Sequence, residues 1–396
     1  MADGSRSTAH PLRLTAPGVA LIAVCYGLAR FAYGLFVPAF RADFTLSATL
    51  LGGIGAGSYA GYCLAIVVSA VAVPRIGARA VATSAGVVAT VGMVGVALAP
   101  NPALLATAVL VAGSSTGLAS PPLAQALARW LAHAIQNRAQ AAVNAGPGVG
   151  IALSGPVALL MVGQWRVAWL CFAGAAAAVA IWVTLAIPRD LDRGRAGERL
   201  GAEFLNVAAD RSSLRLVAAA VLFGAASACT WTFGRDHVTQ ASSLSQATSI
   251  LLWTVLGVSE LAGVAAGDLI TRCGLGRIWI ASTAVLAAAT AVLGLLPFLA
   301  AAAFASVAAF GAAYVTLTTV VFFWALRLHP RHTAASVAVG FLAIAVGQAI
   351  ASPLAGLAVD HVGATCAFLA FAALAALAAL TAFAAPAPAG TPEKSK

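Results

Sequence analysis

Charged side chains are scarce in this sequence: they make up 9% of 396 residues, whereas soluble domains carry about a quarter. So few charges cannot cover the surface of a water-soluble globule of this length. Hydrophobic residues make up 61% of the chain, and a lipid bilayer can solvate that apolar remainder. The composition therefore excludes a soluble enzyme or binding domain and indicates an integral membrane protein.

The motifs of nucleotide, metal and redox sites are also missing. The six cysteines stand in no CxxC or other ligand spacing, and we interpret them as packing residues. Glycines are frequent, but the strand-to-helix setting of a phosphate-binding loop is absent. The net charge of +10 is spread over loops and does not indicate nucleic-acid binding. We expect no cofactor, no metal and no enzymatic activity.

Twelve apolar runs are long enough to cross a bilayer core, which takes roughly 20 residues of helix. Turn and charge signals separate them, such as PRIGAR, PNP, TRCGLGR and LHPRH. We therefore predict an all-α polytopic protein with twelve transmembrane helices at about 16–39, 48–73, 80–99, 103–127, 139–162, 166–187, 214–234, 246–270, 277–297, 300–325, 334–359 and 363–385.

The placement of lysine and arginine predicts the orientation. With the N-terminus inside, 18 basic residues fall in cytoplasmic segments and three fall outside, namely Arg41, Arg166 and Arg235. Both termini are then cytoplasmic. Because the first apolar run is too long for a signal-peptide core, we expect it to remain as the first span of a bacterial inner-membrane protein.

The chain divides into two halves at its longest polar segment. We predict a cytoplasmic tail at 1–15, a six-helix bundle at 16–187, a cytoplasmic linker at 188–213, a second six-helix bundle at 214–385 and a tail at 386–396. Matches at an offset of 197 residues, such as Gly27 with Gly224 and Gly77 with Gly274, favour a duplicated, pseudo-symmetric pair of bundles.

This layout resembles the major facilitator superfamily over essentially the full length. The stretch RFAYGLFVPAF at 30–40 is similar to the first-helix signature of its bacterial YbfB/YjiJ-type transporters, and NAGPGVGIALSGP at 144–156 is similar to a fifth-helix pattern of many antiporters. The resemblance implies two bundles that rock about a central solute site. It also implies that helices 1, 4, 7 and 10 line that site, which favours Trp231 and Tyr314 as lining residues.

The superfamily's loop motif, roughly G-x-x-x-D-R-x-G-R-R, is degenerate here. In the first half Arg75, Gly77 and Arg79 match, and Pro74 stands where the acid belongs. In the second half Arg272 and Gly274 match, with Asp268 placed three residues before the acid position. The resemblance implies that these loop residues take part in gating.

Arg30 is the only charged residue between Arg13 and Arg41, so it is the strongest candidate for function. In an α-helix Tyr26 and Tyr33 flank it on one face together with two glycines. Snorkelling to the headgroups is the alternative, but side chains lean toward a helix's N-terminus, which here points to the midplane. We therefore expect Arg30 to face the protein interior.

Glu260 is the second charge within a predicted span. Burial away from water favours the neutral carboxylic acid, so Glu260 is a candidate for proton exchange or for structural burial. Arg30 and Glu260 have opposite charges, and we hypothesise that they pair in one conformation and part in another. Asn144 and Gln348 are further polar candidates within the runs, where inter-helix hydrogen bonding is the plainer interpretation.

These observations predict a secondary active transporter of a small organic solute, coupled to a proton or another ion and monomeric. Arg30 favours a solute with an anionic group, and the fifth-helix pattern favours proton-driven efflux of hydrophobic compounds. A non-transporting membrane sensor of the same fold is the alternative from another class.

Overall fold

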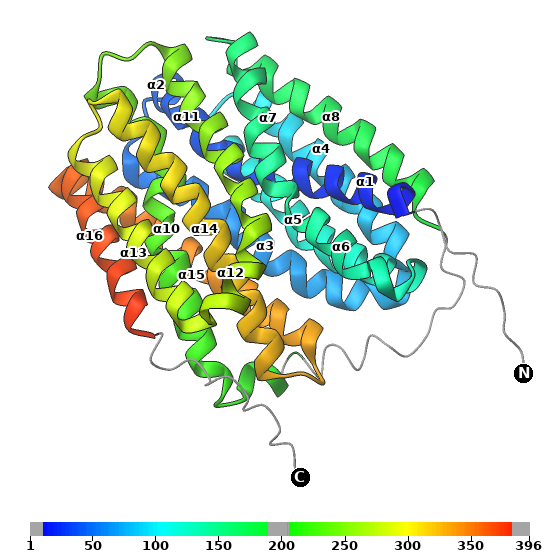
Figure 1. Ribbon diagram of the computed structural model, residues 1–396. Coiled ribbons are helices and arrows are strands. Elements are labelled where there is room, and N and C mark those ends of the chain that lie inside the picture. The colour runs from blue at the N-terminus through cyan, green and yellow to red at the C-terminus, as the bar shows by residue number, and fades with distance from the viewer. Residues whose placement is uncertain (1–10, 189–203, 205, 382–396) are drawn as a thin grey trace, which may run out of the picture.

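The computed structural model describes residues 11–188, 204 and 206–381, and this part of the chain is helical without strands (Figure 1). The first half contains α1 (Pro11–Ile22), η1 (Ala23–Phe31), α2 (Ala32–Phe44), α3 (Ala48–Ile76), α4 (Ala78–Leu98), α5 (Pro102–Trp130), α6 (His133–Asn144), α7 (Gly146–Leu160) and α8 (Trp165–Ala186). The second half contains α10 (Ser213–Ala241), α11 (Gln246–Ser259), η2 (Glu260–Ala265), α12 (Ala266–Cys273), α13 (Leu275–Leu295), α14 (Ala300–Leu328), α15 (Thr333–Val362) and α16 (Ala364–Ala379).

The helices match the twelve predicted apolar runs in order. Among the described residues, ten are long and apolar enough to cross a membrane. A helix pair, Gln246–Gly263 and Ala266–Cys273, is bent by 48° and meets the same criteria when its two helices are taken together. The shorter apolar helix α16 occupies the twelfth run. The all-α polytopic fold predicted from the sequence is therefore confirmed. Residues 1–10 of the predicted N-terminal tail, the predicted C-terminal tail and most of the predicted linker lie outside the described residues, and 11–15 belong to α1. The domain boundaries stay predictions.

The structure repeats itself at the predicted offset. Gly77 ends α3 with φ +88°, and Gly274 ends α12 with the same φ. The Gly77 N–H donates to Val73 O over 2.9 Å, and the Gly274 N–H donates to Ile270 O over 3.0 Å. Both backbones need a positive φ that glycine adopts without strain. The two loops are therefore structural equivalents, 197 residues apart.

Close helix crossings also recur at this offset. Gly27 packs on Gly150 where η1 crosses α7, and Gly224 packs on Ile344 where α10 crosses α15. Gly347, the counterpart of Gly150, packs on the backbone of α10. Small residues let membrane helices approach to backbone contact.

The glycine at such a crossing is essential to the packing. A Cβ at Gly224 would lie 2.8 Å from Ile344 C and 2.9 Å from its Cα. These distances are too short, and the backbone of α15 cannot move away as a flexible side chain could. We expect Gly224→Val to lower stability by about 1–3 kcal/mol or more, read as a lower melting temperature in detergent at a fixed scan rate. Gly174→Val is the matched control, because nothing lies within 4 Å of its Cβ position. Equal melting temperatures for the two variants would contradict this packing argument.

The two halves meet through α2 and α10, α3 and α15, and α7 and α11 (Figure 1). The ends of these helices that are predicted to face outside are joined by polar contacts. Arg41 forms an ion pair with Asp236 at 2.8 Å. The Asp360 carboxylate accepts hydrogen bonds from the backbone N–H of Ala48 at 3.0 Å and Thr49 at 2.8 Å, which satisfies the free N-terminus of α3. The bundles are therefore closed against each other at this end.

Candidate functional site

Arg30 lies in a π-helical segment, η1, between α1 and α2. π-helical turns are wider than α-helical turns and occur often at functional sites. The Arg30 side chain is buried, with 6% of the residue exposed. It points into the protein, so the snorkelling alternative does not hold.

The Arg30 guanidinium has one hydrogen bond to a side chain and no carboxylate partner. Its Nη2 donates to Gln348 Oε1 over 2.9 Å, and its Nε is buried without an acceptor. Aromatic rings surround it instead: Cζ lies 4.8 Å from the ring centroid of Tyr59 and 4.9 Å from that of Tyr62. Phe31 at 5.2 Å and Tyr26 at 5.9 Å complete the shell. Such rings attract a cation but leave its full charge uncompensated.

Gln348 connects this arginine to the opposite bundle. Its Oε1 accepts from Arg30, and its Nε2 donates to Tyr314 Oη at 3.2 Å and to Ser227 Oγ at 3.3 Å. The amide of Gln348 is fully buried and has both its oxygen and its nitrogen engaged. The Arg30–Gln348 hydrogen bond therefore joins η1 of the first half to α15 of the second.

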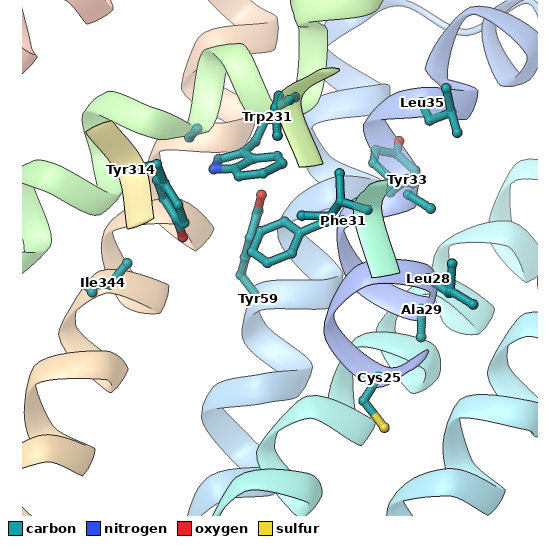
Figure 2. Close-up of a cluster of buried hydrophobic side chains, with 14 of the residues drawn as sticks. Cys25, Leu28, Ala29, Phe31, Tyr33, Leu35, Tyr59, Trp231, Tyr314 and Ile344 are labelled. Carbon is teal, nitrogen blue, oxygen red and sulfur yellow. The ribbon is translucent and has the colours of Figure 1, made fainter. Parts of the chain in front are cut away.

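An aromatic stack continues from Arg30 into the second bundle. The Trp231 indole stacks on Phe31 with centroids 4.3 Å apart and meets Tyr314 edge-on at 5.1 Å. Trp253 and Phe310 contact the same indole at 6.0 and 5.6 Å. Figure 2 shows Phe31, Tyr59, Trp231 and Tyr314 grouped together between the bundles. We call Arg30, Phe31, Tyr59, Tyr62, Trp231, Tyr314 and Gln348 the central cluster.

Several buried polar atoms at and beside the central cluster lack partners. They are Arg30 Nε, Trp231 Nε1 and Trp253 Nε1, all of which are hydrogen-bond donors. Native proteins satisfy nearly all buried polar atoms, so unsatisfied ones call for an explanation such as a ligand or water. The central cluster thus has the chemistry of a ligand site: one unpaired cation, free donors and aromatic surface.

Glu260 begins η2 at the end of α11, where the second half packs against α7. A Cβ added to Gly148 would lie 2.9 Å from Glu260 Cβ and 3.4 Å from its Oε2. Glu260 is buried, and its Oε1 has no hydrogen-bond partner. No ion pair joins it to Arg30 in the described structure. The hypothesised pairing is therefore absent from this conformation.

The other predicted site residues have hydrogen-bond partners outside the central cluster. Tyr33 donates its hydroxyl to Leu51 O of α3 at 2.7 Å. Tyr26 stays near Arg30 and hydrogen-bonds to Ser120 at 2.9 Å. Asn144 is exposed at the end of α6 and accepts from Gln140 at 2.8 Å.

The predicted gating residues lie at the loop ends of α3 and α12. Arg75 is exposed, Arg79 is partly exposed, and Asp268 and Arg272 are exposed. Gly77 and Gly274 provide the two left-handed turns described above. A role in gating stays a prediction for all six residues.

One predicted span ends too early. The sequence placed Arg235 beyond the span 214–234, but α10 continues to Ala241 and buries this residue. Its guanidinium donates to Leu35 O and to Ser249 Oγ. Together with Asp236, Arg235 belongs to the closed end of the interface. The sequence RDH at 235–237, directly after an apolar run, could have indicated this polar contact.

Metal binding finds no support in the part of the chain that the structure describes, where no group of three His, Cys, Asp or Glu residues is arranged to hold an ion.

Comparisons with known proteins agree on the architecture. The family model described as Major Facilitator Superfamily matches residues 19–340. A mutant form of the nucleoside transporter NupG is similar in structure, with a TM-score of 0.78 at 13% identity over 94% of this chain and 99% of that chain. The xylose transporter XylE from E. coli has a TM-score of 0.75 at 16% identity over 93% and 96%.

A bacterial homologue of the human lysosomal transporter Spinster, in an inward-facing conformation, has a TM-score of 0.74 at 15% identity over 97% of this chain and 98% of that chain. No curated protein matches this chain as a relative. At these identities the structural likeness supports the fold alone. Because the family model covers most of the sequence, the chain belongs to the Major Facilitator Superfamily.

Proposed function

We propose that this protein is a secondary active transporter that moves a small organic solute by alternating access across the bacterial inner membrane, with both termini cytoplasmic. The observation that carries the proposal is Arg30, a buried cation without a carboxylate partner, placed where the two bundles meet. A buried charge is costly. No carboxylate among the described residues pairs with Arg30, and a bound solute would supply that counter-charge.

The contacts between the bundles support alternating access. Arg41–Asp236 and the Asp360 contacts close the end predicted to face outside. All of them join one half to the other, so a relative rotation of the halves would break them together. The Arg30–Gln348 hydrogen bond also crosses the interface, so a solute that competes for Arg30 would change the contact between the bundles.

Glu260 is our candidate for proton coupling. Its carboxyl group is packed against α7 at the interface between the bundles and has no ionic partner. Buried in this way, it is stable in the neutral form, and it would ionise when rotation of the bundles exposes it to water. Proton uptake and release would then accompany the conformational change.

A flux assay with purified protein in liposomes tests both parts of the proposal. We expect solute accumulation driven by an imposed proton gradient in the wild type. We expect Glu260→Gln, which mimics the neutral acid, to keep solute counterflow and lose the dependence on the proton gradient. Exposed Asp43 provides the control variant Asp43→Asn, which should keep both. A gradient-driven flux that survives Glu260→Gln unchanged would remove Glu260 from coupling.

Proton-driven efflux of hydrophobic compounds is the second candidate. The stack of Phe31, Trp231, Phe310 and Tyr314 favours it, because apolar ring surface binds lipophilic molecules without regard to charge. A sensor of the same fold is distinguished by the absence of any flux. Membership of the YbfB/YjiJ-type group and the monomeric state stay predictions.

A further inference from the structure

We propose that the central cluster binds a solute with one negative charge and a flat aromatic body. This inference rests on the transporter function proposed above and adds the chemical class of the solute. Three properties of the central cluster support the inference. They are its number of unpaired charges, its aromatic side chains and its polar atoms without hydrogen-bond partners.

The charge count points to a monoanion. Arg30 is the cation of the central cluster, and no carboxylate pairs with it. The nearby buried Arg235 donates to Leu35 O and Ser249 and lies at the closed end, and Arg41 is paired with Asp236. A single unpaired buried cation is neutralised by one negative charge, whereas a dianion would leave a second charge buried without a partner.

The aromatic side chains of the central cluster favour a solute with an aromatic ring system. Phe31 and Trp231 present stacked rings beside the guanidinium, and Tyr314 meets Trp231 edge-on. Tyr59 and Tyr62 face the guanidinium from α3. Aromatic rings favour offset-stacked and edge-to-face neighbours, so a flat ring can join this group with its carboxylate on Arg30.

The polar atoms without hydrogen-bond partners favour a carboxylate over a sugar or a nucleoside as the solute. The unpartnered atoms of Arg30, Trp231 and Trp253 are donors only. The Gln348 amide oxygen is already used by Arg30. Five buried side-chain oxygens of the described residues also lack partners. Thr254 Oγ1 and Glu260 Oε1 belong to residues packed against glycines of α7, and the other three are Ser69 Oγ, Gln125 Oε1 and Ser306 Oγ. A carboxylate supplies acceptors to the free donors, whereas the hydroxyl groups of a polyol also need acceptors, for which the central cluster offers only the tyrosine hydroxyl groups.

Ligand binding to purified full-length protein in lipid nanodiscs tests the inference. The probes are 2-naphthoate, its neutral isostere 2-naphthamide, cyclohexanecarboxylate, the dianion naphthalene-2,6-dicarboxylate, uridine and xylose. Binding is read by tryptophan fluorescence and by the rise in melting temperature that a ligand of the folded state produces. We expect 2-naphthoate to bind about 30-fold more tightly than 2-naphthamide, and more tightly than any other probe.

Variants assign the site. Arg30→Gln should weaken 2-naphthoate binding about 30-fold or more and leave the weak binding of 2-naphthamide unchanged. Trp231→Phe should remove most of the fluorescence response. Arg166→Gln and Trp169→Phe are the matched controls, since Arg166 is exposed and paired with Asp43 and Trp169 packs against Phe36 and Phe172.

Three outcomes overturn the inference. Equal binding of 2-naphthoate and 2-naphthamide removes the charge requirement. Equal binding of 2-naphthoate and cyclohexanecarboxylate removes the aromatic requirement. Binding and liposome counterflow of uridine or xylose, without 2-naphthoate binding, makes the solute class wrong and leaves the transporter function standing. If no solute shows counterflow while 2-naphthoate binds to Arg30, the solute class stands and the transporter function fails.

Discussion

Replacement of Arg30 by methionine is expected to abolish solute transport and leave the ligand-free protein at least as stable as the wild type. Methionine keeps most of the side-chain volume and removes a buried charge that no carboxylate compensates. Removal of an uncompensated buried charge relieves its desolvation cost, which offsets the roughly 1–3 kcal/mol of leaving the buried Gln348 Oε1 without its donor. Transport should fall about 30-fold or more, because the solute loses its only charged partner.

The two readouts together separate a binding role from a structural one. The melting temperature of the purified variant, without ligand, should be no lower than that of the wild type, and the solute should no longer raise it. Arg166→Met is the control, because Arg166 is an exposed arginine paired with Asp43. A melting temperature several degrees below the wild type's, with transport retained, would make Arg30 a structural residue held by Gln348.

Much of the fold follows from composition and from the length of the apolar runs. A bilayer imposes a span length, so each run of about 20 apolar residues predicts one helix. The predicted run at 48–73 became α3 (Ala48–Ile76), and the run at 246–270 became the bent pair of α11 and α12. The internal repeat was also predictable, because Gly77 and Gly274 mark turns whose backbone requires glycine.

The candidate site was only partly predictable. Arg30 stands out because a charge in an apolar run is costly wherever it lies. Its contact with Gln348 bridges residues 318 positions apart, and no local pattern encodes that distance. Tyr59 and Tyr62 were missed, since tyrosines in a glycine-rich helix read as packing.

The closed end of the interface rests on contacts that are also invisible in the sequence. Arg235 and Asp236 read as residues beyond the end of a span, yet they are buried where α10 meets α2. Asp360 reads as a loop acid, yet it accepts hydrogen bonds from the first turn of α3. These contacts exist only because the two bundles meet here, so they belong to one conformation of the transport cycle.

A single methyl group should be enough to disturb this closed end. Gly52 on α3 faces α15, and a Cβ there would lie 3.0 Å from Ser352 C and 3.1 Å from Pro353 Cα. The neighbouring Gly53 has nothing within 4 Å of its Cβ position. Gly52→Ala therefore inserts a methyl group between the bundles, and Gly53→Ala adds the same group to an open surface.

Because overpacking costs about 1–3 kcal/mol, Gly52→Ala should shift the equilibrium away from this conformation by roughly 5- to 150-fold. Spin labels at Gln164 and Ser243, on exposed connections of the two halves, would report the separation of their outer ends. We expect a longer-distance population in Gly52→Ala and a wild-type distribution in Gly53→Ala. A short-distance population that persists in Gly52→Ala would mean that α3 and α15 do not part at this contact, and that opening occurs elsewhere in the interface.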